Sequence, residues 1–386
     1  MSTKNNHHCI YLEFPDFGFG PASTSANLIA YLQQSINCKI ISTGFALDFV
    51  RKIYPQIEYL DVNTTNEREL YHITEAVPRN ATIISNTNPG FALWASKYGY
   101  KVFVVDTLFW MWGLLPDILD KTNSYIVQHY FGDNLTNPSL VNFNISELVY
   151  AKPMINFERW ERKTVSTTSN DVLIAFGGMG NPYSSTFERE YASWILDTIL
   201  PIIVNHKNIQ KIHIVGGGID KDLLMQDIYN YSSNLIIHGA ISPNDYQRLV
   251  TSSKLHFITP GLTSIYESVV AGIAPLFLPG SNVSQIIQSV HLKKFTDYNH
   301  IIFWSRSNEI FDAVTSVSEE EGMEILVEYI RKIIKNSDND RRLINNKIHR
   351  YLNTFDRSED LMALSVLSEQ WKDLPRIEEL LNAYLF

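Results

Sequence analysis

The chain has 386 residues, 45% of them hydrophobic and 19% charged, so it is long enough for two domains and too apolar to be disordered. The net charge of −9 argues against nonspecific nucleic-acid binding, which needs a basic surface. Cys9 and Cys38 are too few for a zinc-thiolate site or a disulfide framework. No apolar run reaches about 18 residues, so no membrane span is expected, and the polar N-terminus predicts a cytoplasmic protein.

Short apolar runs alternate with helix-like segments through the first half of the chain. The predicted strands are residues 10–14, 39–43, 81–85, 101–105, 124–128 and 147–150. The predicted helices are residues 23–34 and 90–98. Strands that are apolar on both faces indicate a parallel sheet with helices on each side.

The same pattern restarts after a polar segment, residues 159–170, which is the predicted linker. The second set of predicted strands is residues 172–176, 211–215, 234–238, 254–258 and 274–278, with helices at 188–204, 221–229, 244–252 and 264–271. This predicts two doubly wound α/β domains, residues 1–158 and 171–365, with a cleft between them. Residues 319–386 are mostly helical, and we expect a last helix at 366–386 to cross back to the first domain.

Three glycine-containing turns follow predicted strands of the second domain. They contain Gly177, Gly178 and Gly180, then Gly216, then Gly261. Because parallel strands end at one edge of a sheet, these turns are expected to lie together. Glycine allows the backbone to approach a ligand closely and leaves its N–H groups accessible. The arrangement predicts a nucleotide-diphosphate site.

The segment after Gly261 adds a helix N-terminus and a carboxylate. The turn at residues 261–264, which includes Leu262, Thr263 and Ser264, leaves backbone N–H groups that attract phosphate. Glu267 lies one turn into the helix, where it can accept hydrogen bonds from a ribose. The alternative is that Ser264 and Glu267 form a capping box and that Gly272 ends the helix.

Residues 261–267 (GLTSIYE), 271–279 (AGIAPLFLP) and Gln285 resemble the donor-binding domain of GT-B glycosyltransferases. The most similar group includes MurG and the UDP-glycosyltransferases of natural-product pathways, and the resemblance covers about residues 171–290. It implies a GT-B fold in which Glu267 binds the donor ribose. It also implies that residues 177–180 and 261–264 face the diphosphate, that Gln285 and Gln288 contact the sugar, and that residues 237–241, with His238, lie near the base.

The chain departs from the family pattern in two places. Gln285 is followed by Ile286 and Ile287, where many relatives have a second polar residue. Many UDP-glycosyltransferases also carry a catalytic His after the first strand, whereas the acidic residues here are Glu13 and Asp16.

An inverting transfer needs a base near the acceptor nucleophile. The candidates are Asp16 in the loop after the first strand, Asp106 after the strand at 101–105, and His129 after the strand at 124–128. Each has a structural alternative: Asp16 as a turn residue beside Pro15, and the others as buried polar groups.

The resemblance also implies that the first domain holds the acceptor. The loop at residues 16–21, with Gly18, Phe19 and Gly20, would overhang the diphosphate. Phe109, Trp110 and Trp112 form either part of the core or the wall of an acceptor pocket.

The sequence therefore predicts a glycosyltransferase that moves a sugar from a nucleotide-diphosphate donor, UDP-sugar first, to a small-molecule acceptor. The family resemblance implies that the reaction inverts the anomeric carbon, and we expect it to need no metal or other cofactor. The alternatives are a GT-B-like nucleotide-sugar epimerase or hydrolase, and a non-catalytic nucleotide-sugar binding protein.

Overall fold

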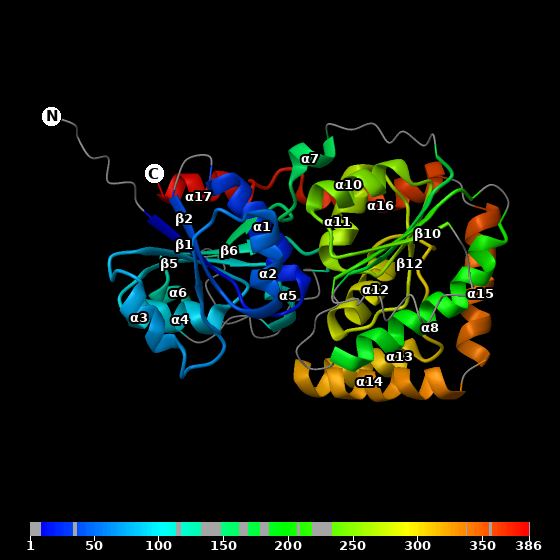
Figure 1. The fold of residues 1–386 in the computed structure, drawn as a ribbon, viewed down its shortest axis with the longest axis horizontal. Helices are drawn as coiled ribbons and strands as arrows, with labels where there is room; N and C mark the ends of the chain where they lie inside the picture. Colours follow the sequence, from blue (N-terminus) through cyan, green and yellow to red (C-terminus); the bar gives the residue numbers. More distant parts are fainter. Residues whose placement is uncertain are drawn as a thin grey trace. The chain divides into compact units, whose positions relative to one another are not determined.

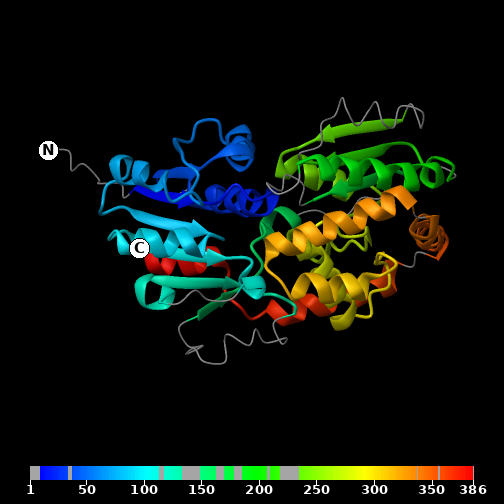
Figure 2. The same cartoon turned by 90° about the horizontal axis from the view of Figure 1, so that it is seen from below.

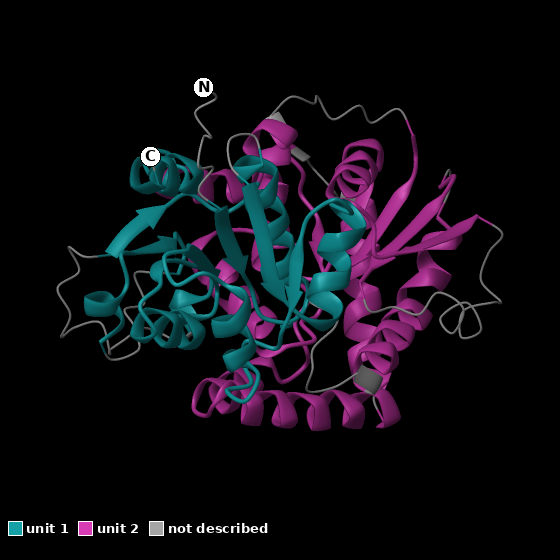
Figure 3. Ribbon diagram, turned by 60° about the vertical axis from the view of Figure 1, so that its left-hand side comes forward, with its two compact units in different colours: residues 1–155, 371–386 teal, residues 156–370 magenta. Residues whose placement is uncertain are grey.

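The computed structural model describes residues 9–33, 37–112, 117–132, 148–161, 169–177, 185–206, 209–217, 234–336, 338–354 and 357–385. The chain divides into two compact units (Figure 3). Unit 1 comprises Met1–Ile155 and Trp371–Phe386, and unit 2 comprises Asn156–Gln370.

Unit 1 is built on a seven-stranded parallel sheet with the order β3-β2-β1-β4-β5-β6-β7 (Figure 1). Its strands are β1 (Cys9–Glu13), β2 (Asn37–Ser42), β3 (Tyr59–Asp61), β4 (Thr82–Asn86), β5 (Lys101–Asp106), β6 (Ser124–Gln128) and β7 (Leu148–Ala151). The register pairs Glu13 of β1 with Ser85 of β4, so the polar ends of neighbouring strands meet at the carboxyl edge of the sheet.

Helices cover both faces of this sheet, as the apolar strands predict. They are α1 (Phe19–Leu32), α2 (Gly44–Ile53), α3 (Leu70–Ala76), α4 (Pro89–Lys97), α5 (Phe109–Trp112), α6 (Ile118–Lys121) and α17 (Ile377–Leu385). One core packs α1, α2 and α17 against side chains such as Leu12 and Ile84, and the other packs α3 and α4 against Tyr11 and Ile83. Alternating residues of one strand therefore belong to opposite cores.

The prediction placed the start of the first helix four residues too late. Helix α1 begins at Phe19 rather than Ser23, because Gly18 takes a φ of 64° and turns the chain directly from the loop into the helix. Pro21 then lies in the first turn, where a missing N–H costs no hydrogen bond. The sequence analysis did not identify α2, β3 and α3, which lie between Ser42 and Val77.

Unit 2 contains a five-stranded parallel sheet with the order β10-β9-β8-β11-β12. Its strands are β8 (Val172–Phe176), β9 (Ile212–Gly216), β10 (Leu235–Gly239), β11 (Leu255–Ile258) and β12 (Leu276–Phe277). The predicted helix at 221–229 lies outside the described residues. The two parallel sheets with flanking helices confirm the predicted α/β class.

The helices of unit 2 also form two layers. They are α7 (Phe157–Glu161), α8 (Ser185–Val204), α10 (Pro243–Ser252), α11 (Leu262–Ala271), α12 (Val283–Phe295), α13 (Ser307–Thr315), α14 (Glu319–Asn336), α15 (Asp338–Thr354) and α16 (Arg357–Trp371). Trp160 of α7 and Leu249 of α10 pack with Leu173 and Ala175 of β8. On the opposite side of the strands, Tyr191 of α8 packs on Phe176, and Tyr351 of α15 packs on Phe257.

Two segments of the chain lie close to the predicted domain boundaries. The segment expected as a linker, residues 159–170, begins inside α7, which belongs to the core of unit 2. The end of the chain belongs to unit 1, where α17, red in Figure 2, buries Ile377 and Leu381. None of the described helices is long and apolar enough to span a membrane.

Candidate functional site

The carboxyl edge of the unit 2 sheet brings together the predicted glycine turns. Strands β9, β8 and β11 are neighbours, and Gly216, Gly177 and Gly261 lie at or just after their ends. The backbone N–H of Gly177 donates to Thr259 Oγ1 at 2.6 Å, and Thr259 Oγ1 donates to the Gly177 carbonyl at 3.1 Å. Thr259, which the sequence analysis did not identify, thus fixes the turn after β8 to the turn after β11.

Helix α11 begins at this edge. Gly261 is the N-cap with an extended backbone and no side-chain cap, and the helix starts at Leu262. The capping-box alternative is therefore wrong, since Ser264 lies inside the first turn instead of at the N-cap. The first backbone N–H groups, those of Leu262, Thr263 and Ser264, have no acceptor one turn earlier within the helix.

The hydroxyl of Ser264 lies between two of the glycines. A Cβ atom added at Gly177 would lie 3.7 Å from Ser264 Oγ, and one added at Gly261 would lie 3.9 Å from it. The turn after β8, the turn after β11 and the first turn of α11 therefore surround one small region. At the other end of α11, Gly272 ends the helix in the left-handed conformation, with a φ of 62°, as expected.

Glu267 lies one turn into α11 and is partly accessible. Burial raises the pKa of its carboxyl to about 7, and the nearby Arg159 and Trp160 of α7 oppose this rise. The charge on Glu267 in turn raises the pKa of Tyr246 on α10, although burial is the larger cause there. Glu267 therefore lies close to side chains of α7 and α10.

The two glutamines of α12 are buried. Gln285 Nε2 donates to the Gly177 carbonyl at 2.8 Å, and its Oε1 accepts from the backbone N–H of Ser281 at 2.8 Å. These bonds hold the turn after β8, so Gln285 has a structural role whether or not it touches a sugar. Gln288 is 2% exposed, and its Oε1 has no hydrogen-bond donor among the described residues.

His238 near the end of β10 belongs to a row of polar groups. His213 Nδ1 and His238 Nε2 are 2.9 Å apart, and His213 Nε2 lies 3.6 Å from the Asp171 carboxylate. Burial lowers the pKa of His213, with Asp171 opposing the effect. Gly178 and Gly180 lie outside the described part of the chain.

The carboxyl edge of the unit 1 sheet also contains a buried carboxyl group, that of Glu13. Glu13 is fully buried, and Thr64 Oγ1 and Asn88 Nδ2 donate to its Oε1 at 2.6 and 2.7 Å. Its Oε2 lies 2.6 Å from Ser85 Oγ, which also lies 3.0 Å from the Asn88 carbonyl. Burial raises the pKa of Glu13 to about 7.

The three base candidates differ in what they contact. Asp16 Oδ1 accepts from the N–H of Ala46 in the first turn of α2 at 2.9 Å. Asp106 is fully buried and accepts from the backbone N–H of Leu108 at 2.9 Å and from the hydroxyl of Tyr125 at 2.6 Å. Burial lowers the pKa of His129 to about 4, so its ring is neutral at pH 7. Of the three, only Asp106 has a side chain without solvent access.

The predicted acceptor residues lie near the same edge of unit 1. Gly18 caps α1, and Phe19 packs edge-on against Phe45 and Phe49 of α2. Gly20 is exposed, with no atom within 4 Å of an added Cβ.

The aromatic residues of α5 divide into two groups. Phe109 is buried and packs edge-on against Tyr125, so it is part of the core. Trp110 stacks on Tyr130 with ring centroids 4.2 Å apart, and its indole N–H has no acceptor among the described residues. Trp112 is the last residue of α5, and its side chain is outside the described part.

No protein-family model matches the sequence, and no curated protein is significantly similar to it. Solved structures do match in fold. The spinosyn rhamnosyltransferase SpnG, complexed with thymidine diphosphate, superposes with a TM-score of 0.55 at 11% identity over 98% of this chain and 100% of that chain. The chain has a GT-B glycosyltransferase-like fold.

Two further structures illustrate the range of these matches. SpnG complexed with spinosyn aglycone has a TM-score of 0.54 at 10% identity, over 98% of this chain and 100% of that chain. MurG of Acinetobacter baumannii has a TM-score of 0.46 at 12% identity, over 94% of this chain and 99% of that chain.

Proposed function

We propose that the protein is a glycosyltransferase whose unit 2 binds a nucleoside-diphosphate sugar. The observation that carries the proposal is that Gly177, Gly261 and Ser264 surround the start of α11, with Glu267 one turn further along. Phosphate oxygens fit the free N–H groups at such a helix end. The fold shared with SpnG, which was solved with thymidine diphosphate, supports a thymidine diphosphate donor, and uridine diphosphate is the alternative that the sequence resemblance implies.

Glu267 would bind the donor ribose through its ionised carboxylate. A carboxylate can accept hydrogen bonds from both hydroxyls of a ribose, whereas its protonated form has less acceptor capacity. Since the pKa of Glu267 is about 7, nucleotide affinity should increase as the pH rises through 7.

In the proposed reaction, an acceptor held by unit 1 attacks the anomeric carbon and inverts it. Backbone N–H groups at the start of α11 would stabilise the leaving diphosphate, so that no metal is required. Trp110, which is partly exposed and stacks on the buried Tyr130, provides an aromatic face suited to a small apolar acceptor.

The first test is nucleotide binding by a Glu267→Gln variant. We expect UDP or TDP to raise the melting temperature of the wild-type protein and to bind Glu267→Gln about tenfold more weakly. Glu309→Gln is the matched control, because Glu309 is an exposed glutamate of the same unit. Calorimetric titration would measure both affinities. No binding of either nucleotide by the wild-type protein would refute the proposal.

A further inference from the structure

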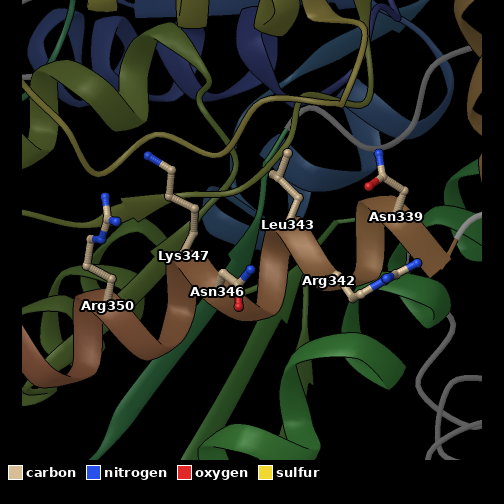
Figure 4. Close-up of a pocket in the computed structure, with 6 residues that line it drawn as sticks. All are labelled: Asn339, Arg342, Leu343, Asn346, Lys347 and Arg350. Carbon is tan, nitrogen blue, oxygen red and sulfur yellow. The ribbon is translucent and has the colours of Figure 1, made fainter.

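After its first turn, which contains Asp338 and Asp340, helix α15 is basic in an acidic protein. Between Arg341 and Phe355 the sequence contains four Lys or Arg residues and no Asp or Glu, although the whole chain carries a net charge of −9. Arg341 is occupied, since its guanidinium pairs with Asp197 of α8 at 2.9 Å. The remaining cations, Arg342, Lys347 and Arg350, line a groove of 420 Å³ together with Asn339, Leu343 and Asn346 (Figure 4). We call this the α15 basic groove.

Two ammonium groups from different helices converge beside the groove. Lys347 Nζ of α15 lies 3.5 Å from the Asn299 carbonyl, and Lys293 Nζ of α12 donates to Asn299 Oδ1 at 2.7 Å. Burial lowers the pKa of Lys347, and the like charges of Arg350 and Lys293 lower it further. In Figure 4 the side chains of Lys347 and Arg350 extend from the helix in the same direction.

Three of the cations in and beside the groove lack an anionic partner in the described part of the chain. Among the described residues, no carboxylate lies within ion-pair distance of Lys293, Arg342 or Lys347. Arg342 Nε donates to the Asp338 carbonyl of its own helix, at 3.2 Å. A half-buried ammonium beside like charges is destabilised unless a counter-ion is present. The groove is therefore built to favour an anion.

We propose that the α15 basic groove binds a phosphate group. Guanidinium groups match phosphate oxygens through paired N–H donors, and Lys347 adds a point charge. Asn339 and Asn346 can donate further hydrogen bonds, and Leu343 offers an apolar wall for the molecule that carries the phosphate. The groove shares no residue with the glycine turns at the carboxyl edge, so it is a second site of unit 2.

The test compares two double variants with equal loss of charge. Arg342→Gln/Lys347→Gln removes two cations of the groove, and Lys332→Gln/Lys335→Gln removes two exposed cations of α14. Binding of inorganic phosphate is measured by calorimetry in the presence of saturating UDP. We expect the groove variant to bind phosphate about tenfold more weakly and the α14 variant to bind it within about twofold of wild type.

A second arm identifies the source of the phosphate. Vesicles of phosphatidylcholine with and without phosphatidylglycerol are sedimented with each protein. If the wild-type protein binds the anionic vesicles and the groove variant does not, the ligand is a lipid headgroup. If the wild-type protein binds phosphate but not the vesicles, the ligand is a soluble molecule. If the groove double variant does not fold, Arg350→Gln, a substitution at an exposed position, replaces it in both binding experiments. The proposal is refuted if the wild-type protein binds neither probe, or if both double variants weaken binding equally.

Discussion

At the scale of single residues, acidic side chains that look alike in the sequence have different surroundings in the structure. Asp106 is buried between a backbone N–H and the Tyr125 hydroxyl. Asp16 is partly accessible and contacts the start of α2. Glu267 is partly accessible beside Arg159, and Glu13 is fully enclosed by neutral donors. A general base must reach its substrate, so the burial of Asp106 leaves Asp16 and His129 as the candidates for later tests.

Glu13 leads to a prediction about pH and stability. Its pKa is about 7 in the folded protein, against 4.5 for an ordinary glutamate, so the folded state binds its proton more tightly. The stability that this proton contributes is complete below pH 4.5 and is lost as the pH rises through 7. Ser85 has one hydroxyl hydrogen for two neighbouring acceptors, which fits a protonated Glu13 that donates to Ser85.

Glu13→Gln should therefore gain stability relative to wild type as the pH rises from about 5 to 8, by roughly 3 kcal/mol in total. An amide resembles the protonated carboxyl and does not ionise. Urea unfolding of both proteins at several pH values measures the difference. A difference that stays constant with pH would show that Glu13 ionises normally.

At the scale of helices and strands, α2 depends on a residue outside itself. Its N-cap, Thr43, makes no side-chain cap, and the carboxylate of Asp16 accepts from Ala46 instead. Gly44 has a φ of 57°, and a Cβ there would lie 2.1 Å from Asp16 Oδ2. The loop after β1 and the start of α2 are thus fitted to each other through Asp16.

Two substitutions separate the capping role of Asp16 from a catalytic one. Asp16→Asn keeps an acceptor for Ala46, whereas Asp16→Ala loses it and should lower the free energy of unfolding by about 1 kcal/mol more. If Asp16 is the base, both variants lose sugar transfer while nucleotide affinity is unchanged. Unfolding curves and nucleotide-release rates give the two readouts. If Asp16→Asn remains active, the base is another residue, and His129 is the next candidate.

At the scale of the whole molecule, the chain completes unit 1 with its last residues. Helix α17 contributes Ile377 and Leu381 to the core that also contains Leu12 and Ala26. The C-terminal residues therefore stabilise the unit that contains the N-terminal residues, and unit 1 is made of two separate segments of the chain.

Leu381→Ala should destabilise unit 1 by about 3 kcal/mol while leaving unit 2 unchanged, because the cavity forms in one core only. Hydrogen exchange followed by mass spectrometry would show faster exchange in β1 and α1 and unaltered exchange in β8. Met362→Ala on α16 is the control, since Met362 is 71% exposed. Equal acceleration in both units would show that they unfold together.

The sequence by itself determined the succession of parallel strands and the edge at which the glycine turns meet. Both follow from local rules, because apolar runs of strand length repeat and parallel strands end on one side. The end of α11 at Gly272 was also predicted from the sequence, whereas its start was placed at Ser264, two residues after the observed first residue, Leu262. Weakly apolar elements such as β3 could not be predicted in this way, because the residues of β3 are not buried.

Only the tertiary structure decided what each polar group of the candidate site contacts. The surroundings of Glu267 come from α7 and α10, and the contacts of Gly177 come from Thr259 and Gln285, which are more than 80 residues away in the chain. Burial and hydrogen bonding depend on neighbours that the chain brings together over long separations. They set the pKa of Glu13 and Glu267, and residue type alone carries no information about them.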